Sequence, residues 1–324
     1  MKKQIIAAAV AATMTSVALA DIAITGTTKV NFTSVDYDDN DSTNTVATEH
    51  DIKITGKNGD TTVVIGIEAD DGDEATGVDT TDVYMTTKIG DINVKAGEWD
   101  NGNNFLRGSS TTQNALQLDG KVGPIGVAYF SGHGTIDDKI TVSADLAGVA
   151  VKYVKQNGDS SGTVYSGDHE VMASTSFGGV GIAYHLDAND KANTDRSSLE
   201  LSGKVGDLDV AFVSIETDSG ATADGDTWAG DFEGTDTGGY KKQAGADIQA
   251  FKVAGNLAGN KVQFIHTAVD KGNGSGRDAD NNKFIVTRPL ASGATFEAMY
   301  ITSEVTGVAA ESGDTLDLEL SVSF

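Results

Sequence analysis

Apolar and polar residues alternate along most of this chain, and its last nine residues, LDLELSVSF, show the pattern most clearly. Leucine, valine and phenylalanine take every second position there, and aspartate, glutamate and serine take the positions between them. Such alternation predicts a β-strand with one apolar and one polar face. We predict no helix beyond short turns in loops, and eighteen strands near residues 22–35, 47–57, 61–70, 79–89, 91–98, 113–122, 125–132, 137–146, 149–157, 168–178, 179–187, 197–206, 208–217, 244–255, 261–270, 282–290, 294–304 and 315–324.

The connections between these segments alternate between short and long. KNGD, VGP, LAG and VGD are short, whereas DYDDNDSTNT, EWDNGNNFLRGSSTT and DKGNGSGRDADNN are long and polar. A soluble β-sandwich gives no reason for this alternation, but a transmembrane barrel has short turns on one side and long loops on the other. Both termini then lie on the short-turn side, which requires an even number of strands. The predicted fold is therefore all-β, a transmembrane antiparallel β-barrel of 16–18 strands, with sixteen if two weak segments between residues 208 and 290 merge or fail.

Five strands carry an aromatic residue shortly after a short turn. IGVAY, VAVKY, VGIAY, LDVAF and FEAMY each end on an aromatic that shares a face with the first and third residues. Transmembrane barrels collect aromatic residues where lipid meets water, so these positions are predicted to form an outer aromatic girdle. The high β-propensity of tyrosine and phenylalanine is the alternative explanation. The girdle residues are Tyr129, Tyr153, Tyr184, Phe212 and Tyr300.

The opposite face of the predicted strands is polar. A soluble sandwich would expose that face to bulk water, whereas in a barrel of sixteen to eighteen strands it lines an aqueous channel. By strand parity this inner set is Lys29, Asn31, Lys53, Lys57, Tyr84, Lys88, Asn93, Lys95, Asp119, Lys121, Lys139, Asp145, Lys152, Glu170, Glu200, Lys204, Asp317 and Glu319.

The first twenty residues differ in composition from the rest. Lys2 and Lys3 precede an apolar run, which ends at Ala18-Leu19-Ala20 before Asp21. This pattern predicts a secretory signal peptide over residues 1–20 and a barrel domain over residues 21–324. Removing both lysines takes the formal net charge from −25 to −27, which argues against nucleic acid as a partner. Disulfides are excluded because the chain has no cysteine.

Sites for metals and for catalysis are not predicted. Residues 36–44 and 278–282 place carboxylates and amides at alternate positions, as loops that bind Ca²⁺ can, but they lack the glycine and the terminal glutamate of the twelve-residue ligand set. The five histidines show no zinc spacing, and no serine stands out beside His185, which parity places inside, or His266, which parity places outside. We therefore predict no metal, no cofactor and no enzymatic activity.

The whole mature chain resembles the Gram-negative general porins. The resemblance is carried by the signal peptide, the opening strand DIAITGTTKVNF, the alternating connections and the final SVSF. It implies a homotrimer with sixteen strands as the usual number. It also implies that Phe324 is the signal by which the outer-membrane barrel assembly machinery recognises the chain.

In that family the third external loop folds into the barrel and narrows the pore. Here the corresponding loop is residues 97–113, with Glu98, Asp100 and Arg107 as the expected constriction and Trp99 and Phe105 as expected anchors. Lys29, Lys53, Lys88 and Lys95 would face it from the pore wall. Opposed acidic and basic groups would create a transverse field that favours polar solutes. A solvated surface loop with scattered wall charges is the alternative.

The predicted function is an outer-membrane porin of a Gram-negative bacterium. It would form a water-filled channel for passive diffusion of small hydrophilic solutes and ions through outer-membrane lipid. The alternative is a secreted acidic β-sandwich or surface-layer protein with a binding or structural role. The sequence leaves the preferred solute and the choice between cations and anions open, because acidic loops and inward lysines act in opposite directions.

Overall fold

A computed structural model describes residues 21–37, 42–70, 77–100, 112–132, 138–157, 168–189, 195–217, 222–223, 243–244, 247–270, 278–306 and 312–324. The main feature is one 18-stranded sheet in which every pair of neighbours is antiparallel. Its strands are β1 (Asp21–Tyr37), β2 (Thr43–Asn58), β3 (Thr61–Asp70), β4 (Gly77–Ile89), β5 (Ile92–Asp100), β6 (Thr112–Val122), β7 (Ile125–Gly132), β8 (Asp138–Leu146), β9 (Val149–Asn157), β10 (Asp168–Phe177), β11 (Val180–Asn189), β12 (Arg196–Val205), β13 (Leu208–Thr217), β16 (Asp247–Leu257), β17 (Asn260–Asp270), β18 (Ala279–Pro289), β19 (Ala294–Val305) and β20 (Gly313–Ser323). A separate two-residue pair joins β14 (Thr222–Ala223) to β15 (Gln243–Ala244).

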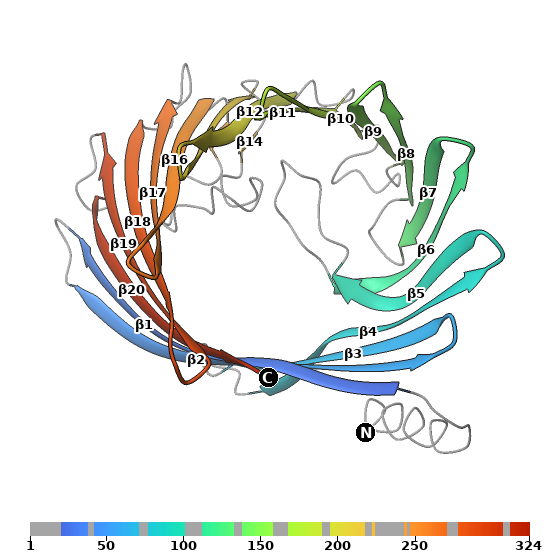
Figure 1. The fold of residues 1–324 in the computed structure, drawn as a ribbon, viewed down its shortest axis with the longest axis horizontal. Coiled ribbons are helices and arrows are strands. Elements are labelled where there is room, and N and C mark those ends of the chain that lie inside the picture. The colour runs from blue at the N-terminus through green and yellow to red at the C-terminus, as the bar shows by residue number, and fades with distance from the viewer. Residues whose placement is uncertain are drawn as a thin grey trace.

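The sheet closes on itself. Strand β1 pairs with β2 on one side and with β20 on the other, so the first and last strands lie side by side in the ring that Figure 1 shows. The seam runs from Thr27 opposite Ser323 to Tyr37 opposite Gly313. A closed sheet leaves no edge with unpaired backbone groups, which is what a strand protein needs in hydrocarbon. Among the described residues, no helix is long and apolar enough to cross a membrane.

Each of the eighteen predicted segments contains a strand. The upper end of the predicted range, eighteen strands, is therefore confirmed, and the alternative of sixteen strands is wrong. The largest difference in a boundary is at β2, which begins at Thr43 rather than near residue 47. Its polar start continues the ladder with β1 as far as the pair Val35 and Thr43. The hairpin therefore extends beyond the apolar part of its outer face, which an alternation of apolar residues does not predict.

Two of the short turns have the same sequence and the same backbone. Ala147 and Gly148 connect β8 to β9, and Ala258 and Gly259 connect β16 to β17. All four residues have positive φ, at 56° and 85° in the first turn and 51° and 82° in the second. Two-residue hairpin turns with positive φ at both positions match the twist of the flanking strands. These turns fix which residues lie opposite each other in the two hairpins, and thereby which side chains point outward and which point inward.

One β-bulge interrupts the regular ladders, between β3 and β4. Gly66 lies opposite Asp82 but Ile67 lies opposite Thr80, so Thr81 is an extra residue. A Cβ on Gly66 would lie 2.6 Å from Thr81 Oγ1 and 3.2 Å from the backbone nitrogen of Asp82, so a side chain there would crowd the bulge. The extra residue brings Asp79 onto the same face as Asp82, so both turn inward.

The outer wall is apolar and exposed. Leucine, isoleucine, valine and aromatic side chains alternate outward on every strand that carries the predicted pattern, including Ile24, Val127, Ile182 and Phe251. Exposed apolar surface on this scale is not expected of a protein whose outer face meets water. The wall therefore has the character of a surface that faces lipid.

Candidate functional site

The inner wall carries both signs of charge in nearly equal numbers. Cross-strand pairs place every residue of the predicted inner set on that face, for example Lys29 opposite Glu49 and Asn93 opposite Asp119. On the described strands the inward acidic residues are Asp21, Glu49, Asp51, Glu68, Asp79, Asp82, Asp119, Asp145, Glu170, Asp187, Glu200, Asp209, Glu297, Asp317 and Glu319. The inward basic residues are Lys29, Lys53, Lys57, Lys88, Lys95, Lys121, Lys139, Lys152, Arg196, Lys204, Lys252, Lys261 and Lys283.

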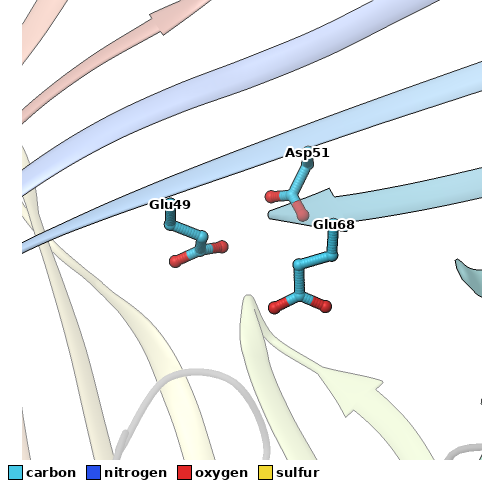
Figure 2. A group of neighbouring side chains, drawn as sticks. All are labelled: Glu49, Asp51 and Glu68. Carbon is cyan, nitrogen blue, oxygen red and sulfur yellow. The ribbon is translucent and has the colours of Figure 1, made fainter. Parts of the chain in front are cut away.

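A patch of three carboxylates lies on the wall formed by β2 and β3. Figure 2 shows Glu49 and Asp51 on one strand and Glu68 on its neighbour, with their carboxylates converging. One oxygen from each lies within 4.8 Å of the others. Lys29 Nζ is 3.0 Å from Glu49 Oε1, so a basic group already compensates part of this charge. The patch is half-buried and makes the wall locally acidic.

The sequence pattern points to oxygen ligands in the long connections and does not indicate this patch on the wall. It arises because Asp51 lies directly opposite Glu68 in the β2–β3 hairpin. Counting back from the short turn at residues 59–60 would have paired these two positions. The prediction that no metal binds stays a prediction, since exposed acidic groups are common without one and Lys29 competes for Glu49.

Aromatic residues and lysines lie together further round the same wall. Lys95 Nζ is 4.0 Å from the ring centre of Tyr84 and 4.3 Å from that of Trp99. Trp99 is only 3% exposed and meets Phe130 edge to face, at 6.0 Å between ring centres. Cation–π contacts of this kind hold a lysine in place along a wall. Trp99 therefore packs firmly at the end of β5. Its expected role as an anchor of the loop stays a prediction, because the connection that follows lies outside the described residues.

Of the three expected constriction residues, the structure describes the side chain of Glu98 alone. Glu98 was predicted to lie in the loop, but it belongs to β5 and alternates with Lys95 and Trp99, so its side chain points to the outer face. The prediction for Glu98 is wrong because β5 continues to Asp100 and thereby sets the face of each residue. Asp100 is paired with Thr112, and the position of its side chain is not described. Arg107 and Phe105 lie outside the described residues.

One sector of the inner wall is apolar, contrary to the prediction of a polar inner face. On β13 and on β16 to β19, inward residues such as Val213, Ile215, Ile265, Ile285 and Ile301 are between 1% and 6% exposed. Because these side chains do not face water, the part of the wall that they form does not line an open channel. Most inward charged residues lie on the other strands, from β20 and β1 round to β12. The sequence did signal the apolar sector, since LDVAFVSI is apolar on both faces of its strand.

The five predicted girdle residues all lie on the outer face. Tyr129, Tyr153, Tyr184 and Tyr300 are between 37% and 42% exposed, and Phe212 lies opposite Phe251 on the same face. The hydroxyl of Tyr129 donates a hydrogen bond of 2.9 Å to Asp138, and that of Tyr300 donates one of 2.6 Å to Asp314. Rings on the apolar side with hydroxyls toward carboxylates suit a boundary between lipid and water. Their role as a girdle stays a prediction.

The terminal phenylalanine lies at the seam. The N–H of Phe324 donates to the carbonyl of Gly26 at 3.0 Å, and the N–H of Gly26 donates to the carbonyl of Phe324 at 2.9 Å. The side chain is 64% exposed on the outer face, near the short-turn end. A role in recognition by the assembly machinery is not tested by this position.

No family model matches the sequence. The curated proteins contain no match either. Solved structures do match over nearly the whole chain. *Pseudomonas aeruginosa* OccK2 (OpdF), solved in complex with glucuronate, has a TM-score of 0.71 at 11% identity and covers 94% of this chain and 98% of its own.

Two further structures agree. *Pseudomonas aeruginosa* OpdK with vanillate has a TM-score of 0.70 at 9% identity, and covers 94% of this chain and 98% of its own. *Acinetobacter baumannii* OccAB4 has a TM-score of 0.70 at 10% identity, and covers 94% of this chain and 97% of its own. The fold is that of these OccK, Opd and OccAB4 proteins. At 9% to 11% identity the likeness concerns the fold alone, and it does not support the general diffusion porin subtype that the sequence resemblance implied.

Proposed function

We propose that this chain is a porin of a Gram-negative outer membrane, and that it forms a water-filled channel for passive diffusion of small hydrophilic solutes and ions. The observation that carries the proposal is a closed sheet of eighteen strands, apolar and exposed outside, charged inside. An antiparallel barrel of this size encloses a channel. A secreted β-sandwich is not favoured, because a sandwich has two sheets with edges and this sheet has none.

The finer parts of the proposal concern assembly. We propose cleavage of residues 1–20, recognition of Phe324 by the barrel assembly machinery, and a homotrimer in outer-membrane lipid. The proposed recognition of Phe324 is supported by its exposed side chain, which lies at the closed seam of the barrel.

The test is conductance in a planar bilayer. Residues 21–324, refolded in detergent, should give stepwise currents that rise with salt concentration, because ions cross an aqueous pore. Membrane fractionation provides a second, independent result. The proposed barrel should stay with outer membranes after a wash in high salt and should need detergent for release. Release by salt together with an absence of current would instead support the secreted protein.

A further inference from the structure

The outer wall carries very few cations. On the strands that the structure describes, the lysines and arginines turn inward with two exceptions, Lys155, toward the long connection after β9, and Arg288. Arg288 is exposed, lies opposite Phe296, and follows the outward Phe284 on β18 by four residues. Because side chains alternate along a strand, this spacing places the guanidinium on the wall that faces lipid and not in the pore.

Arg288 lies at the short-turn end of this wall. Pro289 follows it and ends β18, and a hydrogen bond of 3.0 Å from the N–H of Gly293 to the carbonyl of Leu290 closes the turn. The corresponding outward positions on β6, β10, β12 and β16 are apolar and between 66% and 83% exposed, and their residues are Val122, Phe177, Val205 and Leu257. Arg288 therefore places a cation where these strands have an apolar residue, at the edge of the apolar belt.

The outer surface around Arg288 is apolar. Val286 precedes it on the same face of β18, Phe296 lies opposite on β19, and Leu320 lies beyond Phe296 on β20. An arginine can lay its apolar stem along such a surface and keep its charged end in water. Pro289 restricts the residue before it to an extended backbone, which gives the side chain of Arg288 a fixed starting direction. The guanidinium is thus held where the apolar belt meets water.

No described side-chain carboxylate on the outer wall reaches this arginine. The nearest outward ones on β18 and β19 are Asp280 and Glu304, which lie opposite each other. Asp280 precedes Arg288 by eight residues, a distance of about 26 Å at about 3.3 Å per residue. Glu297 lies closer but turns inward, where it accepts a hydrogen bond of 2.8 Å from Thr287. The positive charge of Arg288 is therefore available to a partner outside the chain.

We propose that Arg288 and the apolar surface around it bind an anionic phospholipid in the leaflet on the short-turn side. The guanidinium donates hydrogen bonds to two phosphate oxygens, which its planar fork suits, and the acyl chains lie against Val286, Phe296 and Leu320. A lipid fits better than a free anion does, because the cation lies at the edge of an exposed apolar wall. The inference goes beyond the passage of solutes, and it rests on the proposed position of the barrel in an outer membrane.

The experiment measures lipid binding by native mass spectrometry of residues 21–324 refolded in a non-ionic detergent. Phosphatidylglycerol and, separately, phosphatidylcholine are added, and the fraction of protein that carries one lipid gives an apparent Kd. Phosphatidylglycerol should bind more tightly, because its headgroup has a net negative charge. Arg288→Gln should raise the Kd for phosphatidylglycerol about fivefold, which is the contribution of one basic residue at an anionic surface.

The matched control is Lys261→Gln. Lys261 lies opposite Thr287, at nearly the same height as Arg288, but it points inward. The substitution removes the same charge from the other face and should change the Kd less than about twofold. Heat-modifiable migration in gels confirms that both variants are folded.

Equal effects of the two substitutions, or equal affinity for the two lipids, would overturn the site. If glycerol 3-phosphate displaces phosphatidylglycerol at the same concentration, the acyl chains contribute nothing and the ligand is not a lipid. Single-channel conductance of the same protein should be unchanged in Arg288→Gln, because the side chain lies outside the pore. A protein that conducts nothing but binds phosphatidylglycerol with the expected difference between variants would contradict the proposed channel and leave the lipid site standing.

Discussion

At the scale of single residues, closure of the barrel depends on a glycine that leaves room for the last side chain. A Cβ on Gly26 would lie 2.6 Å from Cζ of Phe324 and 2.7 Å from the carbonyl oxygen of Asp51. We expect Gly26→Val to destabilise the refolded barrel by about 1–3 kcal/mol, as overpacking does. Phe324→Ala in the same chain should recover part of this loss, because the ring then no longer competes for the space. The urea midpoint of the single and double variants measures the coupling. Strictly additive effects would show that the ring and Gly26 do not interact.

The same residue gives a second prediction, which separates assembly from stability. Deletion of Phe324 removes two backbone hydrogen bonds at the seam, each worth about 0.5–1.5 kcal/mol. If the terminal residue is also the recognition signal, the yield in the outer membrane of cells should fall far more than the denaturation midpoint of refolded protein. Phe324→Tyr keeps an aromatic ring and serves as the control. A normal cellular yield after deletion would leave Phe324 as an ordinary strand end.

At the scale of strands, an arginine should have different effects on folding when it is placed on the outer and on the inner face of β9. Val151 points outward and Lys152 inward, as their pairs with Ala173 and Met172 require. Arginine on the lipid face near the midplane costs about 2–4 kcal/mol, whereas an inward arginine replaces one cation with another. Val151→Arg should therefore reduce the folded, heat-modifiable fraction much more than Lys152→Arg. Equal yields would place both residues in similar surroundings and would contradict the barrel.

The strands also show what sequence can and cannot predict here. The alternation of apolar residues and the short turns together predict all eighteen strands. Each strand needs an apolar residue at every second position, and each short turn sets the position at which the pattern of the next strand begins. They do not predict the bulge at Gly66, which depends on β4 having one residue more than β3 opposite it. Nor do they predict that Glu98 points outward, since that follows from how far β5 continues. The carboxylate patch of Glu49, Asp51 and Glu68 required the register between two strands.

At the scale of the whole molecule, the negative charge is unevenly placed. The inner wall is nearly balanced, so the formal charge of −25 must lie mostly elsewhere. Part of it forms pairs of carboxylates on the outer face at the long-connection ends of the strands, where Asp36 faces Asp314 and Asp280 faces Glu304. All four are exposed. Like charges directly opposite each other repel, and such a rim attracts cations from solution.

This placement predicts a cation preference that depends on salt. The Debye length falls from about 10 Å at 0.1 M to about 3 Å at 1 M, so charges at the rim act on ions in the mouth only in dilute salt. We expect the reversal potential in a KCl gradient to indicate cation preference near 0.1 M and little preference near 1 M. Asp36→Asn with Asp280→Asn and Glu304→Gln should reduce the preference at low salt, whereas the charge-conserving set Asp36→Glu, Asp280→Glu and Glu304→Asp should retain it. If cation preference persists at 1 M KCl and neither set of substitutions changes it, selectivity must come from the inner wall. Glu49, Asp51 and Glu68 would then be the first residues to neutralise.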